Sequence, residues 1–114
     1  MRDDRDRLTD ILTAIDRILT KTAPGRVAFD ADSMLQVWVL HHLQIVGEAA
    51  RSLSEEFRRR HPDKVWSKAA GMRNILVHHY FEIDRDQVWK VAEHDLLPLR
   101  ERVQAILDSE ERGA

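Results

Sequence analysis

The chain has 114 residues, of which 43% are hydrophobic and 33% charged, and its formal net charge is −2 at pH 7. These values fit one soluble globular domain with a modest core and exclude a disordered chain. They give no basic excess of the kind that binds long nucleic acids by bulk electrostatics. Any RNA contact must therefore come from a local group of arginines, or from two copies of a site.

Cysteine is absent, which excludes disulfides and thiolate metal sites and agrees with a reducing, cytoplasmic location. No apolar run approaches the roughly 18–20 residues that a membrane span needs. The first six residues are mixed in charge and lack the apolar stretch of a secretory signal. We therefore expect no membrane association.

A first helix is predicted over residues 3–22. Its apolar residues recur at i, i+3, i+4 and i+7, which places them on one face. They are Leu8, Ile11, Leu12, Ile15, Ile18 and Leu19. Pro24 and Gly25 end this helix.

A long second helix is predicted to start near Asp30 or Asp32, either of which can cap it, and to run to residue 60, before Pro62. Residues 34–46 are apolar nearly all round, so this part should be covered on several sides and form the centre of the fold. The half from residue 51 onward is polar and should project into solvent.

A third helix is predicted from between Asp63 and Ser67 to about His78, and a fourth from Asp84, where Asp84 and Gln87 suggest a capping box. Pro98 interrupts the apolar stripe of the fourth helix and should bend it. Four such helices with short turns predict an all-α, up-and-down four-helix bundle. We expect a single domain over residues 1–114, with an ordered core over 3–109 and a frayed tail over 110–114.

The end of the third helix carries the candidate chemistry: Arg73, Asn74, His78 and Tyr80. On an ideal helix Asn74 and His78 share an exposed face, whereas Arg73 lies about 140° round from His78. Arg73 and His78 can meet at one ligand only if the arginine curls back, the last turn unwinds, or a second protomer supplies the partner group. The third option implies a cleft at the two-fold axis of a homodimer.

This pattern resembles a known family. Arg73-Asn74-x3-His78 matches the Arg-polar-x3-His signature of HEPN domains, and its extension to Tyr80 matches the HepT toxins of toxin–antitoxin pairs. Further segments that resemble the family's landmarks occur in order along residues 8–107: Val46-Gly47-Glu48-Ala49, Pro62 and Trp66, Gly71-Met72, Ile83-Asp84, Val88-Trp89 and Leu97-Pro98-Leu99. The resemblance implies a HEPN-type bundle that dimerises and cleaves RNA without a metal or other cofactor.

The residue types suit that chemistry, because RNA supplies its own nucleophile, the 2′-hydroxyl group. Histidine has a reference pKa of about 6.5, so His78 can transfer protons near neutral pH. The planar fork of Arg73 can grip two phosphate oxygens, and Asn74 can orient His78 or the phosphate. Two protomers would bring two copies of His78, one to act as base and one as acid.

The resemblance also implies a protein partner. HepT toxins are neutralised by a minimal nucleotidyltransferase antitoxin, which attaches AMP to the motif tyrosine. Tyr80 is the only tyrosine in the chain. An anionic adduct two residues from His78 would engage Arg73 and repel RNA phosphate. The alternative is a non-catalytic HEPN subunit that binds nucleotide or regulates a nucleotidyltransferase.

Glu48, His41 and His42 lie on the second predicted helix. A carboxylate on an apolar helix is rarely buried unless paired, so Glu48 is expected to hold Arg73 in place. His41 and His42 point about 100° apart on a helix and are expected to be buried or interfacial, not metal ligands. The three tryptophans are expected in the core or an interface.

The basic run Arg58-Arg59-Arg60-His61 has two interpretations that the sequence leaves open. It can be an RNA-facing patch, because counterion release rewards such clusters. It can equally be a solvated helix end whose cations complement the helix dipole.

Overall fold

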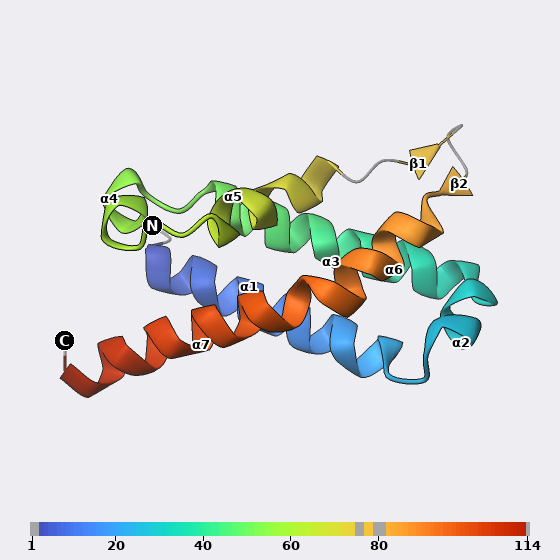
Figure 1. Ribbon diagram of the computed structural model, residues 1–114, viewed down its shortest axis with the longest axis horizontal. Helices are drawn as coiled ribbons and strands as arrows, with labels where there is room; N and C mark the ends of the chain where they lie inside the picture. The colour runs from blue at the N-terminus through green and yellow to red at the C-terminus, as the bar shows by residue number, and fades with distance from the viewer. Residues whose placement is uncertain (1–2, 75–76, 79–81, 114) are drawn as a thin grey trace.

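Two long helices that run in opposite directions, α1 (Asp4–Thr22) and α3 (Ser33–Arg51), form the centre of the molecule (Figure 1). In this computed structural model the backbone is described for residues 3–74, 77–78 and 82–113, and the side chains for residues 3–74 and 83–110. Helix α7 (Leu96–Gly113) packs on α1, and α5 (Val65–Ala70) packs on α3. The two chain ends lie at the same end of the molecule (Figure 1).

Helix α1 begins where the sequence predicts, because the Asp3 side chain accepts a hydrogen bond from the Asp6 backbone N–H and the two residues form a capping box. Its predicted apolar face is buried, with Leu8, Ile11, Ile15 and Ile18 fully covered. The short helix α2 (Arg26–Asp30) was not predicted. It places Phe29 in the core, and the buried Gln36 side chain donates to the carbonyls of Phe29 and Asp30.

The long second helix was predicted with the correct start and the wrong end. Asp32 caps α3 through the Leu35 N–H, as expected, but the helix ends at Arg51 and a separate helix α4 (Glu55–Arg60) follows. Ser54 causes the break, because its hydroxyl caps α4 at the Phe57 N–H and its own N–H and hydroxyl donate to Asp4. These hydrogen bonds stabilise the turn between α3 and α4. They would be lost if the two segments formed one continuous helix.

The predicted helix through His78 is wrong. Helix α5 ends at Ala70, a 3-10 turn η1 (Gly71–Asn74) follows, and β1 (Val77–His78) then pairs antiparallel with β2 (Glu82–Ile83). In this ribbon Val77 lies opposite Ile83 and His78 opposite Glu82. Glycine at position 71 weakens the helix, and the β-branched and aromatic residues of 75–83 favour extended backbone.

The predicted fourth helix is divided in two. Asp84 caps α6 (Arg85–His94) through the Gln87 N–H, as expected, but the chain breaks at Asp95 before α7 begins. Pro98 explains the position of the break, because its ring would collide with the carbonyl of His94 in a continuous helix. Pro98 instead occupies the first turn of α7, where its missing N–H costs little. Helix α7 continues to Gly113, whereas we expected fraying from Glu110.

The expected all-α class is confirmed for the described residues, with the ribbon β1–β2 as a small exception. The core is contributed by α1, α3, α7 and the shorter helices, and it includes Phe29, Phe57 and Trp66. Among residues 3–74 and 82–113, none of the helices has the length and apolar character needed to cross a membrane.

Candidate functional site

Arg73 lies on η1, which is pressed against α3 at Gly47. A Cβ atom on Gly47 would lie 2.9 Å from the Arg73 Cβ and 3.0 Å from its Cα, closer than side-chain atoms normally approach. Only glycine therefore lets η1 reach this position on α3. The packing of Met72 in the core fixes the same turn from the other side. The backbone of Arg73 is thus placed by neighbours that leave it little freedom.

Glu48 pairs with Arg73, as the sequence predicts. The Glu48 Oε2 atom lies 3.5 Å from the Arg73 Nε atom. The reasoning behind that prediction was wrong, however, because Glu48 is not buried: its side chain is 62% exposed, and that of Arg73 is 36% exposed. A pair this open contributes at most about 1 kcal/mol to stability. Its effect is to direct the Arg73 side chain, since Gly47 and Glu48 are adjacent on α3.

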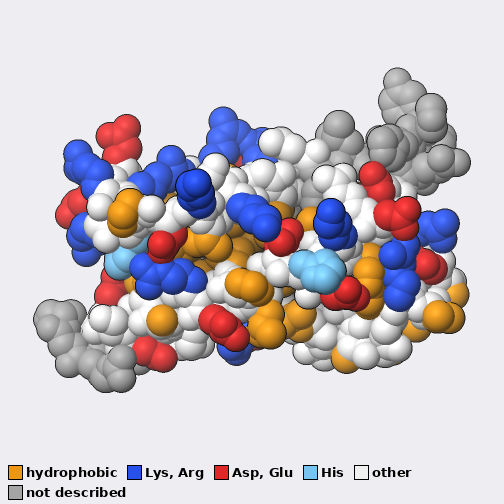
Figure 2. All heavy atoms as spheres, in the orientation of Figure 1, with side chains coloured by type: hydrophobic (Ala, Val, Ile, Leu, Met, Phe, Trp, Pro, Cys, Tyr) orange, Lys and Arg blue, Asp and Glu red, His pale blue; other side chains and the backbone are white. Residues whose placement is uncertain are grey.

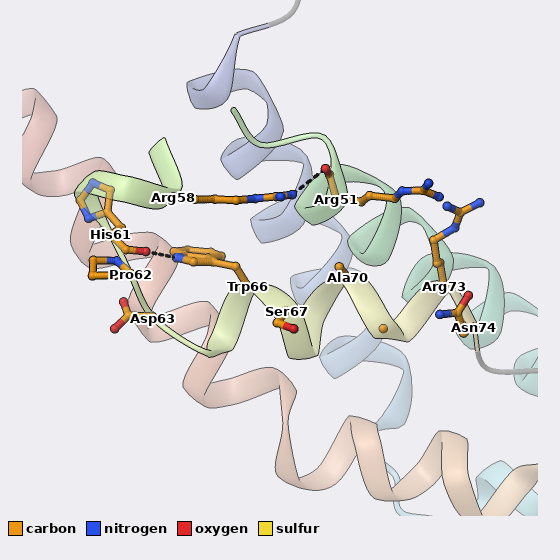
Figure 3. A pocket seen from close by; sticks show the side chains of 11 residues that line it. Arg51, Arg58, His61, Pro62, Asp63, Trp66, Ser67, Ala70, Arg73 and Asn74 are labelled. Atoms are coloured by element: carbon orange, nitrogen blue, oxygen red, sulfur yellow. Dashed lines mark hydrogen bonds between the residues drawn. The ribbon is translucent and has the colours of Figure 1, made fainter. Parts of the chain in front are cut away.

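A groove of about 800 Å³ opens beside Arg73 (Figure 3). It lies between the end of α3, α4 and α5, and it is lined by Arg51, Arg58, His61, Pro62, Asp63, Trp66, Ser67, Ala70, Gly71, Arg73 and Asn74. Figure 3 shows the side chains of Arg51 and Arg73 pointing toward the same end of the groove, with Asn74 below Arg73. Asn74 is exposed, as predicted.

The basic run of α4 is split by the structure. Arg58 lines the groove, and its guanidinium donates to the carbonyls of Arg51 at 2.7 Å and Ala50 at 3.3 Å, at the negative end of the α3 dipole. Arg59 and Arg60 are exposed and do not line the groove. Arg58 thus faces a cavity and its neighbours face solvent, and the RNA-facing interpretation of the run stays a prediction.

His61 and Trp66 close the far end of the groove. The buried Trp66 indole donates to the His61 carbonyl at 2.9 Å, and both rings pack against Phe57. Burial, together with the positive charges of Arg102 and Arg60, lowers the pKa of His61 below its usual value. The imidazole is therefore mostly neutral at physiological pH and adds no charge to the groove.

The other two predicted site residues lie partly or wholly outside what is described. The His78 backbone is in β1, so the helical i, i+4 relation with Asn74 and the 140° separation from Arg73 no longer apply. The His78 side chain and Tyr80 are not among the described residues. The structure thus brings together Glu48, Arg73 and Asn74.

The histidine pair of α3 agrees only in part with the expectation that both residues are buried or interfacial. His42 is buried, and its Nδ1 atom lies 2.8 Å from the Trp38 carbonyl, whereas His41 is exposed. Their rings are nearly perpendicular. Within the residues whose side chains are described, no group of three or more histidine, aspartate and glutamate residues is arranged to hold a metal ion.

The comparison with protein families agrees with the motif. The family described as Ribonuclease HepT-like matches residues 11–106, a stretch that contains every candidate site residue. The chain belongs to the HepT-like ribonuclease family. The resemblance inferred from Arg73, His78 and the flanking segments is therefore confirmed.

Relatives with assigned names agree with the HepT-like match. A protein of Methanocaldococcus jannaschii, named as an RNase by inference, is 32% identical over 106 residues, which are 92% of this chain and 97% of the relative. A protein of Thermococcus cleftensis, named by inference as ribonuclease HepT, is 34% identical over 102 residues, 87% of this chain and 91% of the relative. No solved structure matches this chain.

Arg51 is the groove residue that sequence reasoning missed in this HepT-like chain. It lies three residues after Glu48, a spacing that places two side chains on one face of a helix. That signal was available as soon as Glu48 was assigned to Arg73. The contribution of Arg58 was not predictable, because it depends on the turn at Ser52–Ser54 that folds α4 back over the end of α3.

Proposed function

We propose that this chain is a metal-independent endoribonuclease toxin and that it acts as a homodimer of two up-and-down bundles of HEPN type. One observation carries the proposal: Gly47 and Glu48 place and direct Arg73 at the mouth of a groove lined by two further arginines. A guanidinium held beside an open cationic groove suits a phosphodiester. Membership of the HepT-like ribonuclease family supports RNA as the substrate.

In the proposed reaction Arg73 binds the oxygens of the scissile phosphate and stabilises the charge of the phosphorane. One His78 removes the proton of the RNA 2′-hydroxyl, whose oxygen attacks phosphorus. The bond from phosphorus to the 5′-oxygen breaks, and the second His78 of the dimer protonates that oxygen. The products are a 2′,3′-cyclic phosphate and a 5′-hydroxyl end. Asn74 supports the position of the phosphate or the imidazole.

The exposed face of α3 supports a dimer. Met34 and Val37 are 81% and 58% exposed, which is unusual for large apolar side chains. With His41, Gln44 and Glu48 they follow a spacing of three and four residues in turn, the repeat by which helices pair in coiled coils. A partner helix on this stripe would lie beside Glu48 and hence near Arg73.

The proposed dimer is tested by measuring the molar mass of the protein with light scattering after size-exclusion chromatography. We expect Met34→Glu with Val37→Glu to give monomers, whereas Leu97→Glu, at an exposed apolar residue of α7, should leave the dimer intact. A wild-type monomer, or a dimer that withstands the α3 substitutions, would refute this arrangement.

We further propose that a nucleotidyltransferase antitoxin inactivates the enzyme by transferring AMP to Tyr80. The Tyr80 hydroxyl oxygen would attack the α-phosphorus of ATP, pyrophosphate would leave, and the hydroxyl proton would pass to solvent or a base. Mass spectrometry after incubation with the cognate nucleotidyltransferase and ATP should show one or more added AMP groups, and Tyr80→Phe should show none. Unmodified wild-type protein would contradict this part of the proposal.

The nuclease activity itself is tested with structured RNA in excess chelator. We expect wild-type protein to leave 2′,3′-cyclic phosphate ends, and Arg73→Ala and His78→Ala each to reduce kcat/KM by about 100-fold or more. RNA left equally intact by all three proteins would refute the proposal. If that protein still bound ATP or a nucleotidyltransferase tightly, the non-catalytic HEPN subunit would be the better description.

A further inference from the structure

The groove beside Arg73 extends well beyond that residue. From Asn74 it follows η1 and α5 back to Trp66, a distance of about 14 Å at ~1.5 Å per residue in α5 and ~2.0 Å in η1. Arg51 and Arg58 line its wall from α3 and α4.

The cations of this groove are poorly neutralised. Arg51 makes no ion pair or side-chain hydrogen bond with the residues described, and the guanidinium of Arg58 bonds only to carbonyl oxygens of that same part of the chain. Asp63, the one carboxylate in the lining, is paired with Arg102. Arg51 and Arg73 both line the groove, and Figure 3 shows their side chains pointing toward the same end of it. Because Arg73 is paired with Glu48, Arg51 and Arg58 are the groove cations left without a carboxylate partner among the described residues.

We propose that this groove binds the phosphodiester backbone of the RNA strand next to the cleaved bond, with Arg51 and Arg58 each contacting a phosphate. The inference rests on the proposed function, because it takes Arg73 as the residue that grips the scissile phosphate. Arg58 is held in place by the carbonyls of Ala50 and Arg51, so it loses little side-chain freedom on binding.

The dimensions of the groove favour a strand over a free nucleotide. Successive phosphates of one strand are spaced by about 3.4 Å along a duplex, and further apart when the strand is stretched. A groove about 14 Å long can therefore contact one or more phosphates beyond the one at Arg73. Trp66 is buried against Phe57, so it offers no face for base stacking. Contacts limited to phosphates predict binding with little sequence preference.

Binding is measured by fluorescence anisotropy with a labelled 2′-O-methyl RNA 12-mer, which lacks the attacking hydroxyl and cannot be cleaved. We expect Arg51→Gln to raise Kd about three- to ten-fold and to reduce the salt slope of log K by about 0.7. Arg59→Gln is the matched control, because it removes the same charge from an exposed position outside the groove. It should leave both quantities close to wild type. Equal effects of the two variants, or no binding by wild type, would overturn the proposal.

Two further binding measurements identify the ligand of the groove. Arg51→Lys keeps the charge and should retain more affinity than Arg51→Gln. The effect of Arg51→Gln should also be larger on the 12-mer than on a 2′-O-methyl dinucleotide, which is too short to reach along the groove. If ATP binding depended on Arg51 as strongly as 12-mer binding does, the groove would be a nucleotide site and the strand assignment would be wrong.

The experiments distinguish failure of the proposed RNA binding in the groove from failure of the nuclease proposal. If wild-type protein leaves cleavable RNA intact while 12-mer binding depends on Arg51, the nuclease proposal fails and the groove assignment stands. If wild-type protein cleaves RNA while Arg51→Gln and Arg59→Gln bind alike, the groove assignment fails and the nuclease proposal stands.

Discussion

Two groups of arginines in this molecule have opposite surroundings. Arg26 pairs with Asp30 and Asp86, which joins α2 to α6, and Arg100 pairs with Asp16, which joins α7 to α1. The hydrogen bonds that these arginines donate to the carboxylates raise the pKa of both arginines. In the groove, Arg51 and Arg58 face no free carboxylate among the described residues, and Arg73 has only the partly exposed Glu48.

The difference shows how a chain with a net charge of −2 can offer a cationic site. Several acidic residues neutralise cations elsewhere, as Asp16, Asp30 and Asp86 do, or cap helices, as Asp3 and Asp32 do. Figure 2 shows Asp and Glu side chains interspersed among Lys and Arg side chains on one face of the molecule. The groove retains an excess of positive charge because α3 ends at Arg51 and α4 turns back over it. Charge distribution, not total charge, decides whether an anion can bind here.

The largest effect on the groove is expected from Gly47→Ala. The added methyl group would meet the backbone of Arg73, and η1 would have to move away from α3. We expect a loss of about 1–3 kcal/mol in the free energy of unfolding from overpacking. RNA cleavage should fall by at least ten-fold, because Arg73 moves with η1 and small displacements of a positioning group are costly.

Gly71→Ala is the matched control for that substitution. A Cβ at Gly71 meets nothing within 4 Å, and its backbone is helical at φ −65°, so alanine fits without strain. Denaturant unfolding should show a change between zero and a gain of about 1 kcal/mol. If the two alanine substitutions had the same effect, close packing at Gly47 would not be what positions Arg73.

A smaller effect is expected from Glu48→Gln, which keeps the shape of the side chain and removes its charge. Because the pair with Arg73 is exposed, the free energy of unfolding should change by less than about 1 kcal/mol. We expect kcat/KM for RNA to fall by about three- to ten-fold, since Arg73 is less well directed. Thermal melting and single-turnover cleavage measure the two quantities separately. A large loss of stability with unchanged cleavage would reverse the role assigned to Glu48.

Arg100→Gln probes the structural group of arginines. It breaks the pair that joins α7 to α1, so we expect a small drop in melting temperature. Affinity for the RNA 12-mer should stay at the wild-type value, because Arg100 does not line the groove. A loss of affinity similar to that of Arg51→Gln would mean that RNA binding reflects overall charge and not the groove.

The smallest effect concerns pH. The pKa of His61 is lower in the folded state than in the unfolded state. As pH falls, His61 is therefore protonated in the unfolded chain at a higher pH than in the folded protein. The contribution of His61 to stability is therefore complete above its unfolded pKa of about 6.5 and is lost as pH drops through that value towards the folded pKa. Melting curves between pH 8 and 5 should show a shallower decline for His61→Gln than for wild type. Identical declines would show that His61 does not contribute.

The sequence alone predicted the starts of α1 and α6 and narrowed that of α3 to Asp30 or Asp32, because capping is local: Asp3, Asp32 and Asp84 accept hydrogen bonds from residues three positions on. It also determined the family, through the ordered motif around Arg73 and His78, and the partnership of Glu48 with Arg73. Apolar periodicity identified the buried faces of α1 and α3, because that signal needs no knowledge of the partners.

Only the tertiary structure decided where helices end and which cations share a cavity. The turn at Ser54 depends on contacts with Asp4, which is distant in sequence. The replacement of the third helix by η1 and the β1–β2 ribbon depends on pairing between strands, which no helical wheel reveals. The same long-range contacts bring Arg51, Arg58 and Arg73 around one groove, because the turn after α3 and the close approach at Gly47 are properties of the folded chain.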